Sequence, residues 1–212
     1  MADQVQSRLE ELLRGGHLMP DARLSLRDLS AQLGVSTMPV REAVSRLVAQ
    51  GALVTERNRA IVVPRLDADE FRDLTDIRIL TEVAALRRAM PHVDADLVAR
   101  LRGLDRAFGE AMSDPKATNA VQINFELHFA IYEAARSPSL RRIIATSWLR
   151  AGPMISLDIG LPSRRQRTAN SVQAHHDMVE AIARGDEEAA AEALTRDIRS
   201  TADYIITQVM GG

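Results

Sequence analysis

The chain has 212 residues, 46% hydrophobic and 26% charged, which is enough for the core of one large domain or two small ones. Aromatic residues make up only 3%, so we expect an aliphatic core in which helices outnumber strands. The absence of cysteine excludes disulfides and thiolate metal sites, and no apolar run is long enough to span a membrane. Charged residues near the N-terminus leave no signal-peptide core, so we expect a soluble, cytoplasmic protein without a membrane partner.

Charge is distributed unevenly along the chain, although the net charge is only −2. Residues 1–65 contain nine arginines and seven acidic residues, a net +2, whereas the remainder carries −4. This balance argues against a wholly basic, histone-like nucleic-acid binder. A mildly basic N-terminal part would keep contacts with DNA local, because phosphates repel the acidic remainder.

The first elements predicted along the chain are helices separated by glycines. Apolar residues at helical spacing predict a helix that ends at Gly15-Gly16. A second, short helix carries Leu26 and Leu29 on its inner face and ends at Gly34, which suits a left-handed cap. Ser36 is expected to cap the helix that follows. Two short helices joined by such a turn are typical of a helix-turn-helix, whose second helix lies in the major groove of DNA.

A hairpin is predicted directly after these helices. Ala52–Thr55 and Ala60–Val63 are short strand-like runs on either side of the polar tip 56–59. Residues 1–65 therefore predict a winged helix-turn-helix DNA-binding domain.

The candidate DNA contacts lie at the start of the second helix, on the helix before it and at the tip of the hairpin. Arg41 is suited to bidentate contact with guanine or to a phosphate, and Met38 to contact with a thymine methyl group. Two observations leave an alternative open: helical corners also occur in proteins that do not bind DNA, and Glu42 could orient Arg41. The full set of candidates is Arg27, Ser36, Thr37, Met38, Arg41, Arg57, Asn58 and Arg59.

From Asp67 onward the pattern changes to long helices separated by proline or glycine. Six helices are predicted, at 67–90, 94–113, 117–136, 138–157, 164–184 and 186–209. Residues 66–212 therefore predict an all-α, six-helix antiparallel bundle, and the whole chain is expected to be mainly α.

Four polar side chains of this bundle lie at positions that helix geometry could bring together. Asn124 and His128 share one helix face, His175 lies on the next helix but one, and Asp197 lies on the last helix. Imidazole nitrogens and a carboxylate suit Zn²⁺ or Ni²⁺. The residues alone leave two alternatives open: a buried histidine bonded to a neighbour, and an aspartate paired with an arginine beside it.

Arg78 is the candidate contact for an effector, because an inward guanidinium could hold an anion through two parallel hydrogen bonds. The alternative is a solvated arginine that pairs with Glu82, four residues later. His176 points about 100° away from His175 around the helix, so we expect it at the surface or just outside the metal site.

A long motif runs through the helix-turn-helix segment: Arg27-Asp28-Leu29-Ser30-x-x-Leu33-Gly34-Val35-Ser36-x-x-Pro39-Val40-Arg41-Glu42-Ala43-x-x-x-Leu47-x-x-x-Gly51. It resembles the GntR superfamily of bacterial transcriptional regulators. The resemblance implies that operator DNA is contacted from the two helices and from the wing tip, at Arg27, Ser36, Thr37, Met38, Arg41, Arg57 and Asn58. The sequence departs from the family pattern at Thr37, where arginine is common, and at Asp21, where glycine is frequent. These departures leave the operator sequence open.

Further motifs lie in the helical part: Arg78-x-x-x-Glu82, Asn124-x-x-x-His128 and His175-x-x-Met178-Val179-x-Ala181-Ile182-x-x-Gly185-Asp186. They resemble the FadR-type branch, whose all-helical effector domain is called FCD. Many members bind a divalent metal through an aspartate or asparagine and three histidines. The resemblance places Asn124, His128, His175 and Asp197 at those positions. Because Asp197 replaces a histidine, it implies two histidines, one carboxylate and a weak amide, completed by water or an effector carboxylate.

We therefore expect a ligand-responsive transcription factor that binds a near-palindromic operator as a homodimer. The resemblance makes repression, relieved by a small acidic metabolite, the default. One alternative is a constitutive dimer without an effector, which would have Arg78, His128 and His175 on its outside. The other is a metal-dependent enzyme with a DNA-binding head, but none of the motifs of a metalloprotease, a phosphate-binding loop or a nucleophile elbow is present, so we expect no enzyme.

Overall fold

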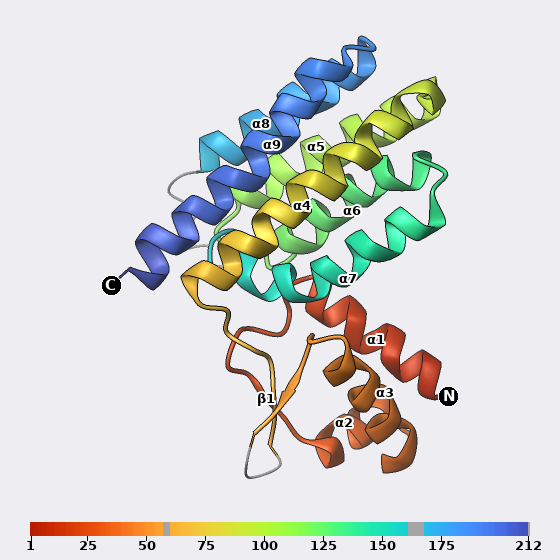
Figure 1. Ribbon diagram of the computed structural model, residues 1–212, viewed down its shortest axis with the longest axis vertical. Helices are drawn as coiled ribbons and strands as arrows, with labels where there is room; N and C mark the ends of the chain where they lie inside the picture. The colour runs from red at the N-terminus through yellow and green to blue at the C-terminus, as the bar shows by residue number, and fades with distance from the viewer. Residues whose placement is uncertain (57–59, 161–167, 212) are drawn as a thin grey trace.

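The computed structural model describes residues 1–56, 60–160 and 168–211, which form two parts of unequal size (Figure 1). The smaller part, here called the head, runs from α1 to β3, and the larger part, here called the body, runs from α4 to residue 211. The helices of the head are α1 (Ala2–Arg14), α2 (Leu26–Leu33) and α3 (Thr37–Ala49). Its strands β1 (Arg23–Leu24), β2 (Val54–Thr55) and β3 (Ile61–Val62) form an antiparallel sheet in the order β1-β3-β2.

The described residues of the body form helices joined by turns and contain no strand. Its helices are α4 (Ala68–Ala89), α5 (Ala95–Ser113), α6 (Ala120–Ala134), α7 (Pro138–Ile155), α8 (Thr168–Ala183) and α9 (Glu187–Tyr204). A 3-10 turn, Met90–His92, follows α4, and a π-helical turn, Ile205–Met210, continues α9. Helix α4 packs against α6, α7 and α9, and α8 packs against α5 and α9. The predicted mainly α fold, a winged helix-turn-helix followed by a helical bundle, is confirmed.

Local sequence explains where several of these helices begin and end. The Ser25 hydroxyl accepts a hydrogen bond from the Asp28 N–H at the start of α2 (3.3 Å). Asp67 and Glu70 form a reciprocal capping box at the start of α4. Gly34 ends α2 with φ of +64°, the left-handed conformation expected of it.

The head and the body have separate hydrophobic cores, with one exception. The core of the head includes Leu9 and Leu13 of α1 and Leu47 of α3, and it also takes in Leu149 from α7 of the body. The preceding residue, Trp148, is fully buried in the core of the body. Helix α7 thus contributes consecutive side chains to two cores, and it lies directly against α1 (Figure 1).

A glycine makes this close packing of α1 and α7 possible. A Cβ atom at Gly152 would lie 2.4 Å from the backbone oxygen of Leu13 and 2.7 Å from that of Arg14. Backbone atoms cannot move aside as the end of a flexible side chain can, so only glycine allows this approach.

The wing contains a strand that the sequence did not predict, and the turn before it has an unusual backbone conformation. Strand β1 was not predicted, because a two-residue strand leaves no periodicity and exists only through its pairing with β3. Asp21 has φ of +68°, which explains why glycine is frequent there, and its carboxylate pairs with Arg65 (2.6 Å). Within the described ranges, no helix combines the length and apolar character that a membrane-spanning segment needs.

Candidate metal centre and nucleic-acid interface

The first turn of α3 presents an exposed polar surface on the head. Ser36 holds the N-cap position of α3, but its side chain makes no capping bond to the helix. Thr37 and Met38 follow, and the Met38 side chain is 70% exposed. Arg27 on α2 and Arg41 on α3 are also exposed. The structure therefore leaves all five predicted contacts of the two helices accessible to a duplex.

Arg41 keeps its guanidinium unpaired among the described residues, although a carboxylate follows it in the sequence. Glu42 pairs instead with Arg46, one turn further along α3 (2.5 Å), and Arg46 also pairs with Asp3 of α1 (2.7 Å). The alternative in which Glu42 orients Arg41 is therefore not what the structure contains. The three predicted contacts at the wing tip, Arg57, Asn58 and Arg59, lie outside the described residues.

A cluster of two histidines and one aspartate lies inside the body, where helices α6, α8 and α9 meet. His128 Nε2 lies 3.3 Å from His175 Nε2 and 3.2 Å from one oxygen of Asp197. His175 Nε2 lies 3.4 Å from the other Asp197 oxygen. Both histidines are fully buried, and Asp197 is 6% exposed. We call these three residues the His–Asp cluster.

The separations in the His–Asp cluster fit a bound metal ion. Ligand bonds of about 2.0–2.1 Å to Zn²⁺ in a tetrahedral arrangement place the ligand atoms roughly 3.3 Å apart. The three separations lie within 0.1 Å of that value, with each histidine next to a different oxygen of Asp197. One ligand atom from each of the three residues lies within 4.8 Å of the other two, which is close enough for a single cation.

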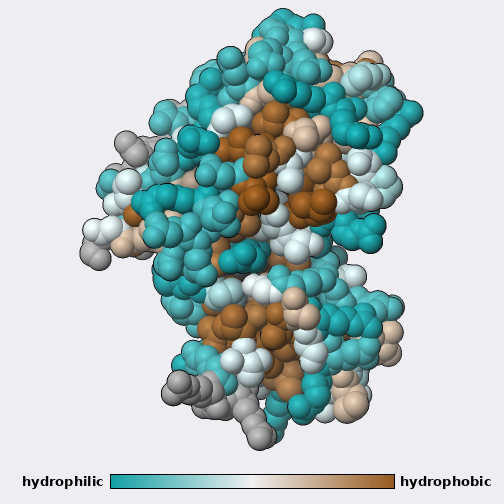
Figure 2. All heavy atoms as spheres, viewed as in Figure 1, coloured by the Kyte–Doolittle hydropathy of each residue, from teal (hydrophilic) through white to brown (hydrophobic). Residues whose placement is uncertain are grey.

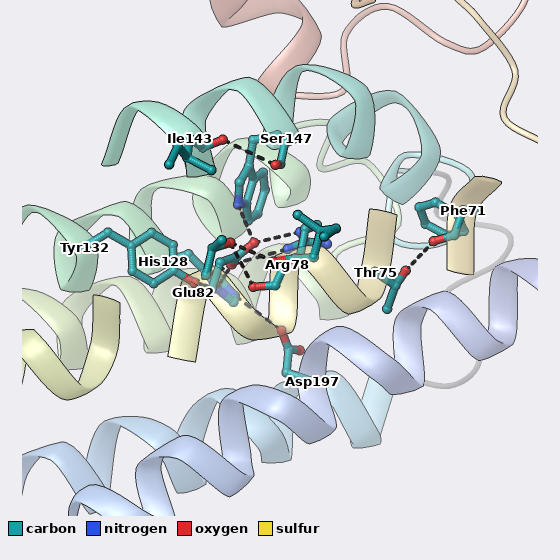
Figure 3. Close-up of polar contacts among 12 residues, drawn as sticks. Phe71, Thr75, Arg78, Glu82, His128, Tyr132, Ile143, Ser147 and Asp197 are labelled. Atoms are coloured by element: carbon teal, nitrogen blue, oxygen red, sulfur yellow. Dashed lines mark hydrogen bonds and ion pairs between the residues drawn. The ribbon is translucent and has the colours of Figure 1, made fainter. Parts of the chain in front are cut away.

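His128 is held from its other side by Tyr132 and Glu82 (Figure 3). His128 Nδ1 lies 3.0 Å from the Tyr132 hydroxyl, and that hydroxyl donates a short hydrogen bond to Glu82 Oε2. Burial lowers the pKa of His128, but Asp197 and Glu82 outweigh it and leave the pKa above its ordinary value. A ligating histidine whose second nitrogen is bonded in this way is common at metal sites.

Asp197 is ionised, and it belongs to the cluster rather than to the arginines beside it. Burial raises the pKa of Asp197, but His175 and His128 outweigh it and hold the pKa far below its ordinary value. Arg196 pairs with Asp177 and Arg199 with Asp76 instead. The alternative of a simple pair with a neighbouring arginine is therefore excluded.

His175 and His176 differ sharply, although they are adjacent. The ring of His175 packs on Phe108 with 4.4 Å between the ring centres, and its buried Nδ1 has no hydrogen-bond partner among the described residues. The His176 side chain is 57% exposed and lies 3.2 Å from Asp105. His176 is thus at the surface, which was one of its two expected places.

Arg78 points inward, as the effector hypothesis requires, and it pairs with Glu82, as the alternative requires. Its Nε donates to Glu82 Oε1 (2.7 Å), and its guanidinium lies over the Trp148 ring at 4.6 Å from the ring centre. Trp148 Nε1 donates to the same Glu82 oxygen (3.1 Å). The pair is buried rather than solvated, with Arg78 4% and Glu82 0% exposed.

A small cavity of about 10 Å³ lies beside the cluster. That is room for about one water, so a larger ligand requires side chains to move. Asn124, buried one turn before His128, lines this cavity rather than adding a measured contact to the His–Asp cluster. The cavity is lined by Arg78, Phe108, Asn124, Ile155, Ile159, Ser171, Asp197, Ile198 and Thr201.

Sequence reasoning missed the roles of Tyr132, Trp148 and Phe108. A signal existed for Tyr132, because it lies four residues after His128 and shares its helix face. Trp148 and Phe108 come from helices whose neighbours cannot be inferred from spacing along one segment.

The exposed α3, the wing and the helical body define a DNA-binding protein of the winged helix-turn-helix class. Comparison with known proteins extends this conclusion. Residues 1–63 match the gntR family of bacterial regulatory proteins, and residues 73–200 match the FCD domain. The chain belongs to this family, in the branch that carries an FCD domain. It is a DNA-binding transcriptional regulator and not an enzyme.

Individual relatives agree with this assignment. The chain is 32% identical to the regulator McbR of Escherichia coli (strain K12) over 150 residues, which are 71% of this chain and 68% of McbR. The solved structure of E. coli McbR/YncC matches 98% of both chains with a TM-score of 0.87 and 26% identity. A relative from Paenarthrobacter nicotinovorans, named for repression of a D-xylose utilization operon, is 28% identical over 93% of this chain and 85% of its own length.

Proposed function

We propose that this regulator is a homodimeric repressor. A small acidic metabolite, bound beside a divalent metal, would weaken its binding to DNA. In this proposal residues 1–65 are the DNA-binding domain, and residues 66–212 bind the effector and form the dimer. The main support for the proposal is the His–Asp cluster. Its ligand atoms are separated by distances typical of a metal site, and it lies beside a cavity that Arg78 also lines.

The metal would be held by His128, His175 and Asp197, with the Asn124 amide as a weak fourth ligand. The donor set of two imidazoles, one carboxylate and one amide suits Zn²⁺ or Ni²⁺. Such an ion would supply an open coordination position and a positive charge in an otherwise buried site. The residues themselves would orient the ligands and keep bulk water out.

Charge supports an acidic effector. A divalent ion on one carboxylate leaves a net positive charge, and the buried pair of Arg78 and Glu82 adds none. An anion would therefore be favoured over a neutral molecule. The N–H groups of Arg78 that do not bond to Glu82 are suited to hydrogen bonds with the carboxylate of such an effector.

An apolar surface on the body supports the dimer. Leu80 and Ile77 of α4 are 68% and 42% exposed, and Ile143 of α7 is 52% exposed. Figure 2 shows hydrophobic side chains gathered over these neighbouring helices, with hydrophilic ones around them. A rimmed apolar patch of this kind is typical of a protein interface. A second copy docked there by two-fold symmetry would present two recognition helices to a near-palindromic operator.

The burial of three side chains argues against the alternative of a constitutive dimer without an effector. This alternative required Arg78, His128 and His175 on the outside of a tightly packed bundle, but all three side chains are buried around shared polar contacts.

A thermal-shift screen tests the proposal directly. Untagged, chelator-stripped protein is heated with small carboxylic acids, with and without Zn²⁺ or Ni²⁺, and the unfolding temperature is recorded. We expect a metal to raise it, and one class of acid to raise it further only when metal is present. If purified protein contains no metal and neither ion raises the unfolding temperature, the metal part of the proposal is wrong.

A further inference from the structure

We propose that Glu82, acting through Tyr132, is the positioning residue that fixes the proton of His128 on Nδ1 and so turns the lone pair of Nε2 toward the metal. This inference rests on the proposed metal site, and it names a residue outside the predicted ligand set. The juxtaposition that carries it is the chain of contacts from Glu82 to Tyr132 to His128, drawn from α4 and α6 (Figure 3).

The direction of each hydrogen bond follows from the charge of Glu82. This carboxylate is fully buried, and it accepts from Arg78 Nε and Trp148 Nε1 on one oxygen. Its Oε1 lies 2.7 Å from Arg78 Nε in a buried ion pair, so the carboxylate carries a negative charge. An ionised carboxylate only accepts, so the bond to Tyr132 must use the hydroxyl proton of the tyrosine.

The hydroxyl of Tyr132 then has no proton left for His128. A tyrosine hydroxyl carries a single proton, and the hydrogen bond to Glu82 uses it. At 3.0 Å from that oxygen, His128 Nδ1 must therefore be the donor. A neutral His128 carries its remaining lone pair on Nε2, the atom that faces His175 and Asp197.

The second histidine has no such arrangement. His175 Nδ1 is buried without a hydrogen-bond partner among the described residues, so nothing there selects one tautomer. His128 is accordingly the oriented ligand and His175 the adaptable one. The metal affinity should depend on the Tyr132 hydroxyl more than on other buried hydroxyls of the body.

Removal of that hydroxyl is the first arm of the test. Affinity for Zn²⁺ is measured on untagged, full-length protein by competition with a chromophoric chelator. We expect Tyr132→Phe to weaken zinc binding by about tenfold, since loss of an outer partner of a ligating histidine usually costs about 10–100-fold. The matched control is Thr75→Val on α4, which removes a buried hydroxyl that donates to the Phe71 carbonyl (2.6 Å) and contacts neither histidine. It should change zinc affinity by less than about twofold.

The second arm reads the tautomer without any metal. Nitrogen-15 NMR of the chelator-stripped protein shows whether Nδ1, Nε2 or both carry a proton. Without metal, the Asp197 carboxylate, 3.2 Å from Nε2, also favours a proton on that atom. We expect His128 to keep a proton on Nδ1 in the unmodified chain and in Thr75→Val, and to lose the Nδ1 proton while keeping the one on Nε2 in Tyr132→Phe. Resonances are assigned from single substitutions of the five histidines.

The two arms separate failure of this inference from failure of the metal site. If the unmodified chain binds no zinc, the metal proposal fails, and the tautomer measurement alone decides whether Glu82 and Tyr132 orient His128. If it binds zinc but Tyr132→Phe binds equally well with His128 unchanged, the positioning role is overturned.

Discussion

The head and the body place their functional side chains in opposite environments. In the head, the candidate contacts Ser36, Thr37, Met38 and Arg41 stand exposed above an apolar core. In the body, His128, His175, Asp197 and Arg78 are buried within the core itself. A surface meant for a polyanion needs accessible donors, whereas a site for a small ligand gains strength from exclusion of water. We therefore expect substitutions in the head to change DNA binding with little effect on stability, and those in the body to change both stability and ligand binding.

The largest effect is expected from Arg78→Ala. It leaves the buried Glu82 carboxylate without its cation, and breaking a buried pair typically costs about 3–5 kcal/mol of unfolding free energy. Arg87→Ala is the control on the same helix, since Arg87 pairs with Glu188 at the surface and should cost less than about 1 kcal/mol. Denaturant titration measures both. Equal values for the two variants would contradict the contrast between buried and exposed pairs.

Arg78→Lys separates folding from effector binding. A lysine keeps the positive charge beside Glu82 but cannot hold a carboxylate through two parallel bonds. We expect effector affinity to fall about tenfold while DNA affinity stays within about twofold. Equal losses in both would indicate that Arg78 serves folding only.

Loss of the metal is the next largest effect. At a Zn²⁺ concentration about 100 times the dissociation constant, binding should stabilise the chain by about 2.7 kcal/mol, which is about 5–10 °C in unfolding temperature. His128→Ala combined with His175→Ala should abolish that rise. His176→Ala, which changes the exposed neighbour of His175, should retain it. A full loss in His176→Ala would place the metal elsewhere.

Arg41→Ala tests the head. Loss of a base or phosphate contact in each of two recognition helices should weaken operator binding by about a hundredfold, without change in dimerisation or unfolding temperature. Fluorescence anisotropy with an operator selected from a random DNA library measures the affinity. Arg106→Ala, an exposed arginine of α5, is the control and should have little effect. Unchanged affinity in Arg41→Ala would remove that residue from the interface.

A charge on the apolar surface of the body tests the dimer. Leu80→Glu should weaken dimerisation at least about tenfold, because an unpaired carboxylate would be buried in the interface. Val54→Glu, at a 39% exposed position in the head, should leave it unchanged. Sedimentation of both variants over a range of concentrations gives the answer. A dimer that resists Leu80→Glu must use another surface.

The smallest effects compare one glycine in each part. Gly34→Ala should cost about 1 kcal/mol, because alanine is strained at φ of +64° although its Cβ would meet nothing within 4 Å. Gly103→Ala, inside α5 with equally open space, should instead stabilise the chain by about 0.5–1 kcal/mol. Both variants replace glycine with alanine. Opposite signs of the change in unfolding free energy, measured by denaturant titration, would therefore reflect the different backbone conformations at the two positions.

The contrast between head and body also explains what the sequence could predict. Gly34 and the polar start of α3 lie within one short segment, so local rules place both. The His–Asp cluster joins three helices, and its members could be named but their convergence could not be derived from spacing. Glu82 received a role only as a surface partner of Arg78, because burial and the approach of Tyr132 and Trp148 depend on tertiary packing.

Helix α7 determines whether a structural change in the body also reaches the head. Trp148 shares Glu82 with Arg78, while the next residue, Leu149, is packed among side chains of the head. Consecutive residues of a helix are fixed about 100° apart, so Trp148 cannot be displaced by rotation of α7 without Leu149 also moving. Three residues after Leu149, Gly152 packs so closely against the backbone of α1 that α7 has little room to move there. A ligand that displaced Trp148 by rotating α7 would therefore also move Leu149 within the core of the head.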